Sequence, residues 1–121
     1  NLFPKVDAVF IPNSAMVQSA MALVSDVAIE NKKPTYSCSA ATVEAGAMAT
    51  VAMSDKEIGA ATADMIIQYL EGTAVEDIPA VVFPASDEVL NEDVIASLGI
   101  TFPDGATDNA TFVKTSTGDE K

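Results

Sequence analysis

Few residues in this chain could carry out chemistry by themselves. Histidine and arginine are absent, and Cys38 is the single cysteine among 121 residues. Without an imidazole or a second thiolate, the chain cannot build a disulfide, a zinc cluster or a Cys-His nucleophile. We also find no glycine-rich phosphate loop. The sequence therefore predicts no catalytic residue, no metal site and no cofactor. Because Cys38 lies where a strand should end, we expect it to be a small buried thiol.

A second set of residues could bind a solute without transforming it. These residues follow three strand-like segments and open helix-like ones. They are Asn13, Ser14, Ala15, Ser39, Ala40, Ser54 and Asp55. In open parallel sheets, ligands bind beyond the carboxyl ends of strands, near helix N-termini. Free N–H groups at helix starts can hold a carboxylate without arginine, and hydroxyl or amide oxygens can hold polar groups.

The sequence thus predicts that this set binds a ligand, and Asp55 could pair with an ammonium group. The alternative is local. Asn13, Ser14 and Ser54 are also good helix caps, and Ser39 suits a turn. Ser54 opens a Ser-x-x-Glu capping box with Glu57, and an acidic residue in the first helical turn is favourable by itself.

The segments that must position these residues follow an α/β pattern. Strand-like runs of β-branched and apolar residues cover 6–11, 35–38 and 47–53. Apolar residues recur at three- and four-residue spacing over 15–30 and 55–70, which predicts two long amphipathic helices. Strand, helix and strand in that order imply parallel pairing with a right-handed crossover. We therefore expect an α/β fold, with a parallel sheet flanked by helices.

The last third of the chain is more irregular. Residues 78–84 predict a strand that proline at both ends would place at a sheet edge. Asn91 is expected to cap a short helix that Gly99 ends. From residue 104 onward the composition is mainly Gly, Thr, Asp, Asn and Lys, so residues 104–121 are expected to form a flexible, loosely attached tail.

Composition and charge exclude several classes of protein. Hydrophobic residues make up 49% of the chain, which argues against intrinsic disorder. The formal net charge is −12, and this acidity argues against partners that are nucleic acids, because phosphate contacts need a basic surface. Asp, Glu, Lys or Pro interrupts the apolar stretches well before eighteen residues, so no membrane-spanning segment is expected.

Several short segments, in their order and spacing, resemble a known family. They are Val6-Asp7-Ala8-Val9-Phe10-Ile11-Pro12, Ala47-Met48-Ala49-Thr50, Glu57-Ile58-Gly59, Leu70-Glu71-Gly72, Asn91 and Leu98-Gly99-Ile100. The chain is similar, over residues 6–103, to ABC-transporter substrate-binding proteins of the tryptophan/tyrosine-uptake type. This resemblance implies a type I periplasmic-binding-protein fold, in which two α/β lobes close on a solute.

The resemblance also implies a domain organisation. Residues 1–103 would be the C-terminal part of a solute-binding protein and would lie mostly in its second lobe. The chain would cross to the first lobe near residues 48–53, place 54–72 there, and return through 81–84. A missing N-terminal half would supply most of the first lobe. Alone, the fragment is expected to self-associate through the exposed apolar face of the helix over 55–70.

By the same resemblance, the protein would lie outside the cytoplasm, in the periplasm or lipid-anchored at the outer face of the cytoplasmic membrane. Its partners would be a small-molecule solute and an ABC permease and ATPase, and it would not be an enzyme. Two alternatives stay open, because fold alone does not fix function. One is the ligand-sensing domain of a signalling receptor with this fold. The other, less favoured, is a fragment of a flavodoxin-like α/β enzyme.

The chain departs from the family pattern at two places. Amino-acid-binding members resemble one another in a Thr-Asp-Asn-Thr-like run where this chain has Asn13-Ser14-Ala15-Met16, and they carry Asp where this chain has Ser54. Those acidic groups would meet a ligand ammonium. Their absence puts an α-amino-acid ligand in doubt, although Asp55 could substitute.

Overall fold

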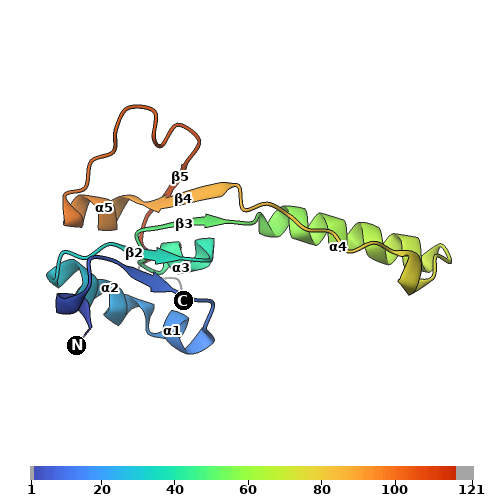
Figure 1. Cartoon of the computed structure of the whole chain (residues 1–121), viewed down its shortest axis with the longest axis horizontal. Helices are drawn as coiled ribbons and strands as arrows, with labels where there is room; N and C mark the ends of the chain where they lie inside the picture. The colour runs from blue at the N-terminus through green and yellow to red at the C-terminus, as the bar shows by residue number, and fades with distance from the viewer. Residues whose placement is uncertain (1, 117–121) are drawn as a thin grey trace. The chain divides into compact units, whose positions relative to one another are not determined.

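The computed structural model describes residues 2–116, and the chain divides into two compact units. The first, here called the sheet unit, comprises Asn1–Ala52 and Asp87–Lys121. The second, the helix unit, is Met53–Ser86. Figure 1 labels most of their helices and strands. Nowhere in the described part of the chain is a helix both long enough and apolar enough to span a membrane.

The sheet unit is built on a sheet of five strands in the order β1-β2-β3-β4-β5. Their bounds are Val9–Ile11 (β1), Thr35–Ser37 (β2), Ala49–Ala52 (β3), Asp87–Asn91 (β4) and Thr111–Val113 (β5). β1, β2 and β3 run parallel, β4 is antiparallel to β3, and β5 is parallel to β4. Ala52 pairs with Asp87, so the chain leaves and re-enters the sheet at one end, and β4 must run opposite to β3.

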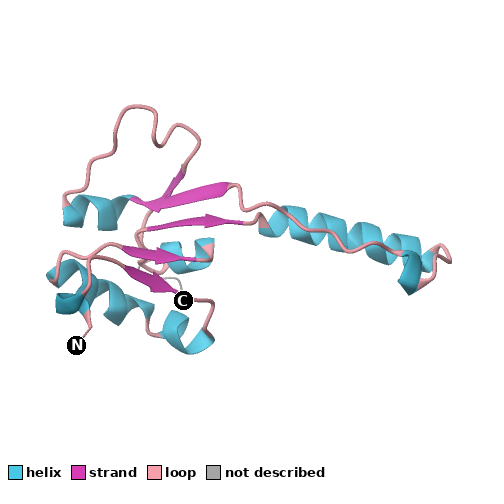
Figure 2. Cartoon of the chain, in the orientation of Figure 1, coloured by secondary structure: helices cyan, strands magenta, loops and turns pink. Residues whose placement is uncertain are grey.

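Short helices connect and cover these strands, and Figure 2 separates helix from strand by colour. In the sheet unit they are η1 (Phe3–Lys5), α1 (Ala15–Ser19), α2 (Met21–Glu30), α3 (Ala40–Glu44) and α5 (Glu92–Leu98). The α/β fold with flanking helices is confirmed. The helix predicted over 15–30 is instead divided at Ala20, whose φ of −103° and ψ of 12° lie outside the helical range.

Two apolar clusters hold the sheet unit together. In the first, Met21 of α2 and Val43 of α3 pack against Ile11 and Val89 on one face of the sheet. In the second, Val94 of α5 packs against Met48, Ala49 and Leu90. Burying such side chains stabilises the folded state by about 25 cal/mol for each Å² of apolar surface removed from water, so these clusters are the main source of the unit's stability.

The predicted strand over 78–84 is wrong. In the structure residues 78–86 form no strand, and the fourth strand is β4, a few residues later. Pro79 and Pro84 have no N–H group for a ladder, which disfavours pairing there. β4 was not predicted because it begins with the charged residues Asp87 and Glu88. Only these first residues are accessible, whereas Val89, Leu90 and Asn91 are buried.

Residues 104–121 were predicted to form a loosely attached tail, but the described part of this segment adds a strand to the sheet. Residues 111–113 form β5, where Leu90 pairs with Phe112 and Asn91 with Val113. Beyond β5, the Ser116 amide donates to the Glu44 carbonyl at 2.8 Å. This strand was not predicted, because the surrounding composition is polar and because its pairing partners lie about twenty residues earlier in the chain. The remainder of that prediction, residues 117–121, lies outside the described residues.

The helix unit contains one long helix, α4 (Asp55–Leu70), followed by the short η2 (Val75–Asp77). As predicted, Ser54 caps α4, because its hydroxyl accepts from the Glu57 amide at 3.4 Å. No residue of α4 is buried. Figure 2 shows the chain running back along this helix as a loop. Helix and loop enclose two shallow apolar grooves of about 390 and 370 Å³.

Candidate solute-binding edge

The parallel strands of the sheet unit bring most of the predicted ligand set to one edge. β1, β2 and β3 are neighbours and point the same way, so their carboxyl ends lie along the same side of the sheet (Figure 1). Asn13, Ser14 and Ala15 follow β1 there, and Ser39 and Ala40 follow β2. We call these residues the solute edge. Sites of open α/β sheets lie at such edges.

The other two predicted residues follow β3 but belong to the helix unit. Ser54 is the N-cap of α4, and Asp55 is its first residue. The local alternative therefore holds for Ser54, whose hydroxyl is engaged by the Glu57 amide. A ligand contact by Ser54 or Asp55 stays a prediction.

The two serines of the solute edge have no such engagement with their helices. Ser14 and Ser39 stand at the N-caps of α1 and α3 with extended backbones, but in the described structure neither side chain makes a cap hydrogen bond. The Asn13 carboxamide oxygen accepts from the Gln18 side chain at 3.0 Å, and the Ser39 carbonyl accepts from the Ser37 hydroxyl at 2.9 Å. Both edge hydroxyls are therefore available to a ligand.

The solute edge is also electrically neutral. Asn13, Ser14, Ala15, Ser39 and Ala40 carry no ionisable side chain. The groups on offer are hydroxyls, a carboxamide and backbone N–H groups, which can donate to an anionic oxygen or bond a neutral polar group. Chemically, this arrangement can hold a small polar solute, and nothing in it would activate a nucleophile.

Cys38 lies beside this edge and is exposed, so the prediction of a buried thiol is wrong. Along β2 the side chains alternate, with Thr35 and Ser37 buried and Tyr36 exposed, and Cys38 continues the alternation on the exposed side. The alternation was readable from the sequence only once the ends of the strand were known.

We expect the Cys38 thiol of the folded chain to react fully with an aromatic disulfide reagent within minutes at mildly alkaline pH, because the thiol is exposed and the reagent can reach it without unfolding. The release of one thiolate per chain, followed by absorbance, measures this. The same chain unfolded in urea should give the same endpoint at a similar rate. A reaction that needs unfolding would contradict the exposed position.

A separate groove of about 410 Å³ lies in the sheet unit, and none of the predicted ligand residues lines it. Its walls include Phe10, Tyr36, Val51 and Phe102. Phe10 and Tyr36 are register partners on adjacent strands, and they are 64% and 40% exposed. Parallel sheets are normally buried on both faces. This groove is therefore an incompletely covered sheet face, marked in the sequence by large apolar residues at alternate strand positions.

The α/β fold is of the kind in which ligands bind beyond the carboxyl ends of parallel strands. Comparison with known proteins makes this specific. The family model described as ABC transporter substrate binding protein matches residues 1–114, and the chain belongs to this family. It is 30% identical over 114 residues to a tyrosine-binding protein of Clostridioides difficile (strain R20291), covering 94% of this chain and 32% of that protein.

Solved structures agree. A ligand-free, open substrate binding protein with adhesive properties from Clostridium difficile superposes with a TM-score of 0.78 at 33% identity, covering 95% of this chain and 38% of that one. An ABC domain in complex with L-Trp from Streptococcus pneumonia gives 0.79 at 33% identity, with 92% and 38% covered. The chain thus spans only about a third of the length of these relatives.

Proposed function

We propose that this chain forms part of the second lobe of an extracytoplasmic solute-binding component of an ABC transporter. In this role the solute edge holds a small polar molecule, which the protein delivers to a permease and its ATPase. The observation that carries the proposal is the neutral edge where the parallel strands β1 and β2 end, with the hydroxyls of Ser14 and Ser39 not used as helix caps. Membership of the substrate-binding family supports it.

We further propose that residues 54–72 belong to the first lobe of the complete binding protein and that the lobes close on the solute by hinge motion. The division of the chain at Met53–Ser86 supports this assignment. The two chain segments that join the units leave the sheet side by side, since Ala52 pairs with Asp87. Hinges are a few residues at element ends that absorb backbone rotation, and these positions fit that description.

For the ligand we propose an amino-acid-like solute that is recognised chiefly through its carboxylate. Two relatives are described as tyrosine-binding and as bound to L-Trp, which supports an amino-acid-like shape. The solute edge of this chain offers donors for a carboxylate but no carboxylate of its own for an ammonium group. Removing the α-amino group of a ligand should therefore cost less affinity than removing its carboxylate.

A thermal-shift panel tests this proposal. It compares L-tryptophan and L-tyrosine with their deaminated acids, 3-indolepropionate and 3-(4-hydroxyphenyl)propionate, and with tryptamine and tyramine. A bound solute stabilises by RT ln(1 + [L]/Kd), so only ligands that bind raise the midpoint. We expect both acid-bearing groups to raise it and the amines not to. Stabilisation by the amines but not the acids would overturn the carboxylate-based recognition, and no response at all would overturn the proposed amino-acid-like ligand.

A matched pair of variants locates the site. The double change Ser14→Ala and Ser39→Ala should abolish the solute-induced shift while leaving the midpoint without solute unchanged, because neither hydroxyl makes a cap bond. Ser54→Ala should instead lower the midpoint without solute, since losing an engaged cap costs about 1 kcal/mol. The chain by itself is expected to bind more weakly than a complete two-lobed protein.

A further inference from the structure

The side chain of Asn91, at the end of β4, is completely buried and joins several elements. Its amide nitrogen donates to the Val43 carbonyl at 2.8 Å and to the Thr115 hydroxyl at 3.0 Å. Its oxygen accepts from the amides of Asp93 and Val94, both at 3.1 Å, which caps α5. A cap needs only the last two bonds. The first two reach residues 48 and 24 positions away.

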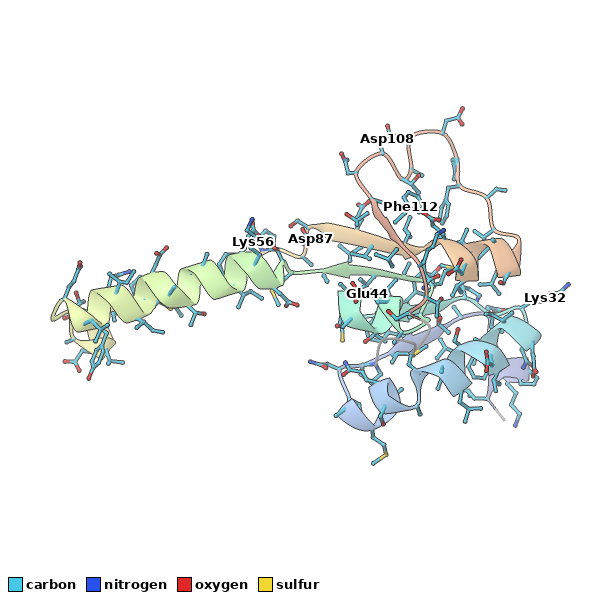
Figure 3. All side chains as sticks on the ribbon, turned by 180° about the vertical axis from the view of Figure 1, so that it is seen from behind. Lys32, Glu44, Lys56, Asp87, Asp108 and Phe112 are labelled. Carbon is cyan, nitrogen blue, oxygen red and sulfur yellow. The ribbon has the colours of Figure 1, made fainter. Side chains whose placement is uncertain are left out.

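The segment after β5 adds two more bonds to the same junction. The Thr115 amide donates to the Asp93 carboxylate at 2.9 Å, at the first turn of α5. The Ser116 amide donates to the carbonyl of Glu44 at 2.8 Å. Figure 3 labels Glu44 on α3. We call the arrangement of Asn91, Asp93, Thr115 and Ser116 the clasp.

The clasp binds the C-terminal end of α3, and the N-terminal end of this helix lies at the solute edge. α3 begins after Ser39 and ends at Glu44. The two carbonyls that receive bonds from the clasp, those of Val43 and Glu44, are the last two of this helix. A helix this short is unstable in isolation, because the conformational entropy lost in nucleating it exceeds the stabilisation that one turn of hydrogen bonds provides. Its position therefore depends on tertiary contacts, and the clasp supplies these two polar ones.

We propose that Asn91 and Thr115 are positioning residues for solute binding, acting through α3 and without touching the solute. This inference rests on the proposed function of the solute edge. Once the clasp is loosened, α3 loses its polar anchors while Val43 keeps it near the core, so the helix start moves relative to β2. The polar residues that follow β2 then no longer meet the solute together with Asn13 and Ser14.

The test uses Thr115→Val, which keeps the shape of the side chain and removes the hydroxyl, and Thr115→Ser, which keeps the hydroxyl. Native-state hydrogen exchange is read at the amides of Ala45, Gly46 and Ala47, which bond within and just after α3, and at the strand amides. Solute-induced thermal shift is read on the same proteins. We expect Thr115→Val to speed exchange at those three amides about fivefold, leave the strand amides unchanged and weaken solute binding about fivefold, as a loss of about 1 kcal/mol predicts.

Controls separate the possible outcomes. Thr115→Ser should restore both readouts, and truncation after Ser116, which keeps the clasp, should behave like the parent, whereas truncation after Lys114 should behave like Thr115→Val. Uniform acceleration of all amides, or accelerated α3 exchange with unchanged solute binding, would overturn the positioning role. If the parent chain binds no solute in the panel, the proposed amino-acid-like ligand is overturned, and the positioning role fails with it.

Discussion

Replacing Gly46 with alanine is expected to destabilise the sheet unit more than any other single methyl addition at a glycine of the described chain. Gly46 has φ of +117°, a conformation that residues with a side chain rarely adopt. A Cβ atom there would lie 2.9 Å from both Cβ and Oγ of Ser25. Ser25 is buried on α2 and cannot turn away as a surface side chain would. Backbone strain and overpacking each cost about 1–3 kcal/mol, so we expect a loss of about 3 kcal/mol.

Urea unfolding followed by far-ultraviolet circular dichroism measures this loss, and two other glycines provide controls. Gly99 also has positive φ, +68°, but a Cβ atom added there would meet nothing within 4 Å, so Gly99→Ala should cost only about 1 kcal/mol of left-handed strain. Gly59 lies within α4 with open space around it, and Gly59→Ala should stabilise the helix by about 1 kcal/mol.

A double-mutant cycle isolates the contact itself. Ser25→Gly removes both atoms that a methyl group on residue 46 would meet. Gly46→Ala should therefore cost less in the Ser25→Gly background than in the parent, with a coupling energy of about 1 kcal/mol or more. Equal costs in the two backgrounds, or a cost for Gly46→Ala no larger than that for Gly99→Ala, would show that the close approach to Ser25 is unimportant.

The second large effect concerns association. We expect the chain to self-associate through the helix unit and Met65→Glu to weaken that association at least tenfold, about 1.4 kcal/mol. Met65 lines both apolar grooves of this unit. No residue of α4 is buried, and Ile66 is 54% exposed. A unit this small cannot bury a core of its own, so its apolar surface gains most by contact with another surface. A carboxylate at the centre of that contact would be desolvated without a partner.

Sedimentation velocity over a range of concentrations measures the association. Ala63→Glu is the matched control, because it adds the same charge at an exposed α4 position that lines neither groove. Salt provides an independent check. Two chains of net charge −12 repel each other, and the Debye length falls from about 10 Å at 0.1 M salt to about 3 Å at 1 M, so association should strengthen with salt. A parent chain that stays monomeric in high salt would refute self-association.

The most reliable predictions from sequence were those that depend on neighbours along the chain. The helix caps at Ser54 and Asn91 and the left-handed end at Gly99 are all present. Each depends on hydrogen bonds or backbone angles within about four residues, so the residue types specify the feature locally. The parallel order of the first three strands followed from strand and helix succession, since a crossover helix permits little else.

The candidate site could be predicted from the sequence only in part. The sequence placed Asn13, Ser14 and Ser39 after strands that the structure confirms as parallel neighbours. It did not show that the hydroxyls of Ser14 and Ser39 make no cap bond while that of Ser54 does. Nor did it reveal the exposure of Cys38, because one residue more or less in β2 would reverse which side chains face the core.

What the amino-acid sequence alone determined is therefore the class of fold, the helix ends and the order of residues along the solute edge. Tertiary structure alone decided that the fourth strand is Asp87–Asn91, that residues 111–113 join the sheet, and that Asn91 reaches Val43 and Thr115. The physical reason is distance along the chain. Caps and turns are satisfied by adjacent residues, whereas strand pairing and the clasp need donors and acceptors that only the folded chain brings together.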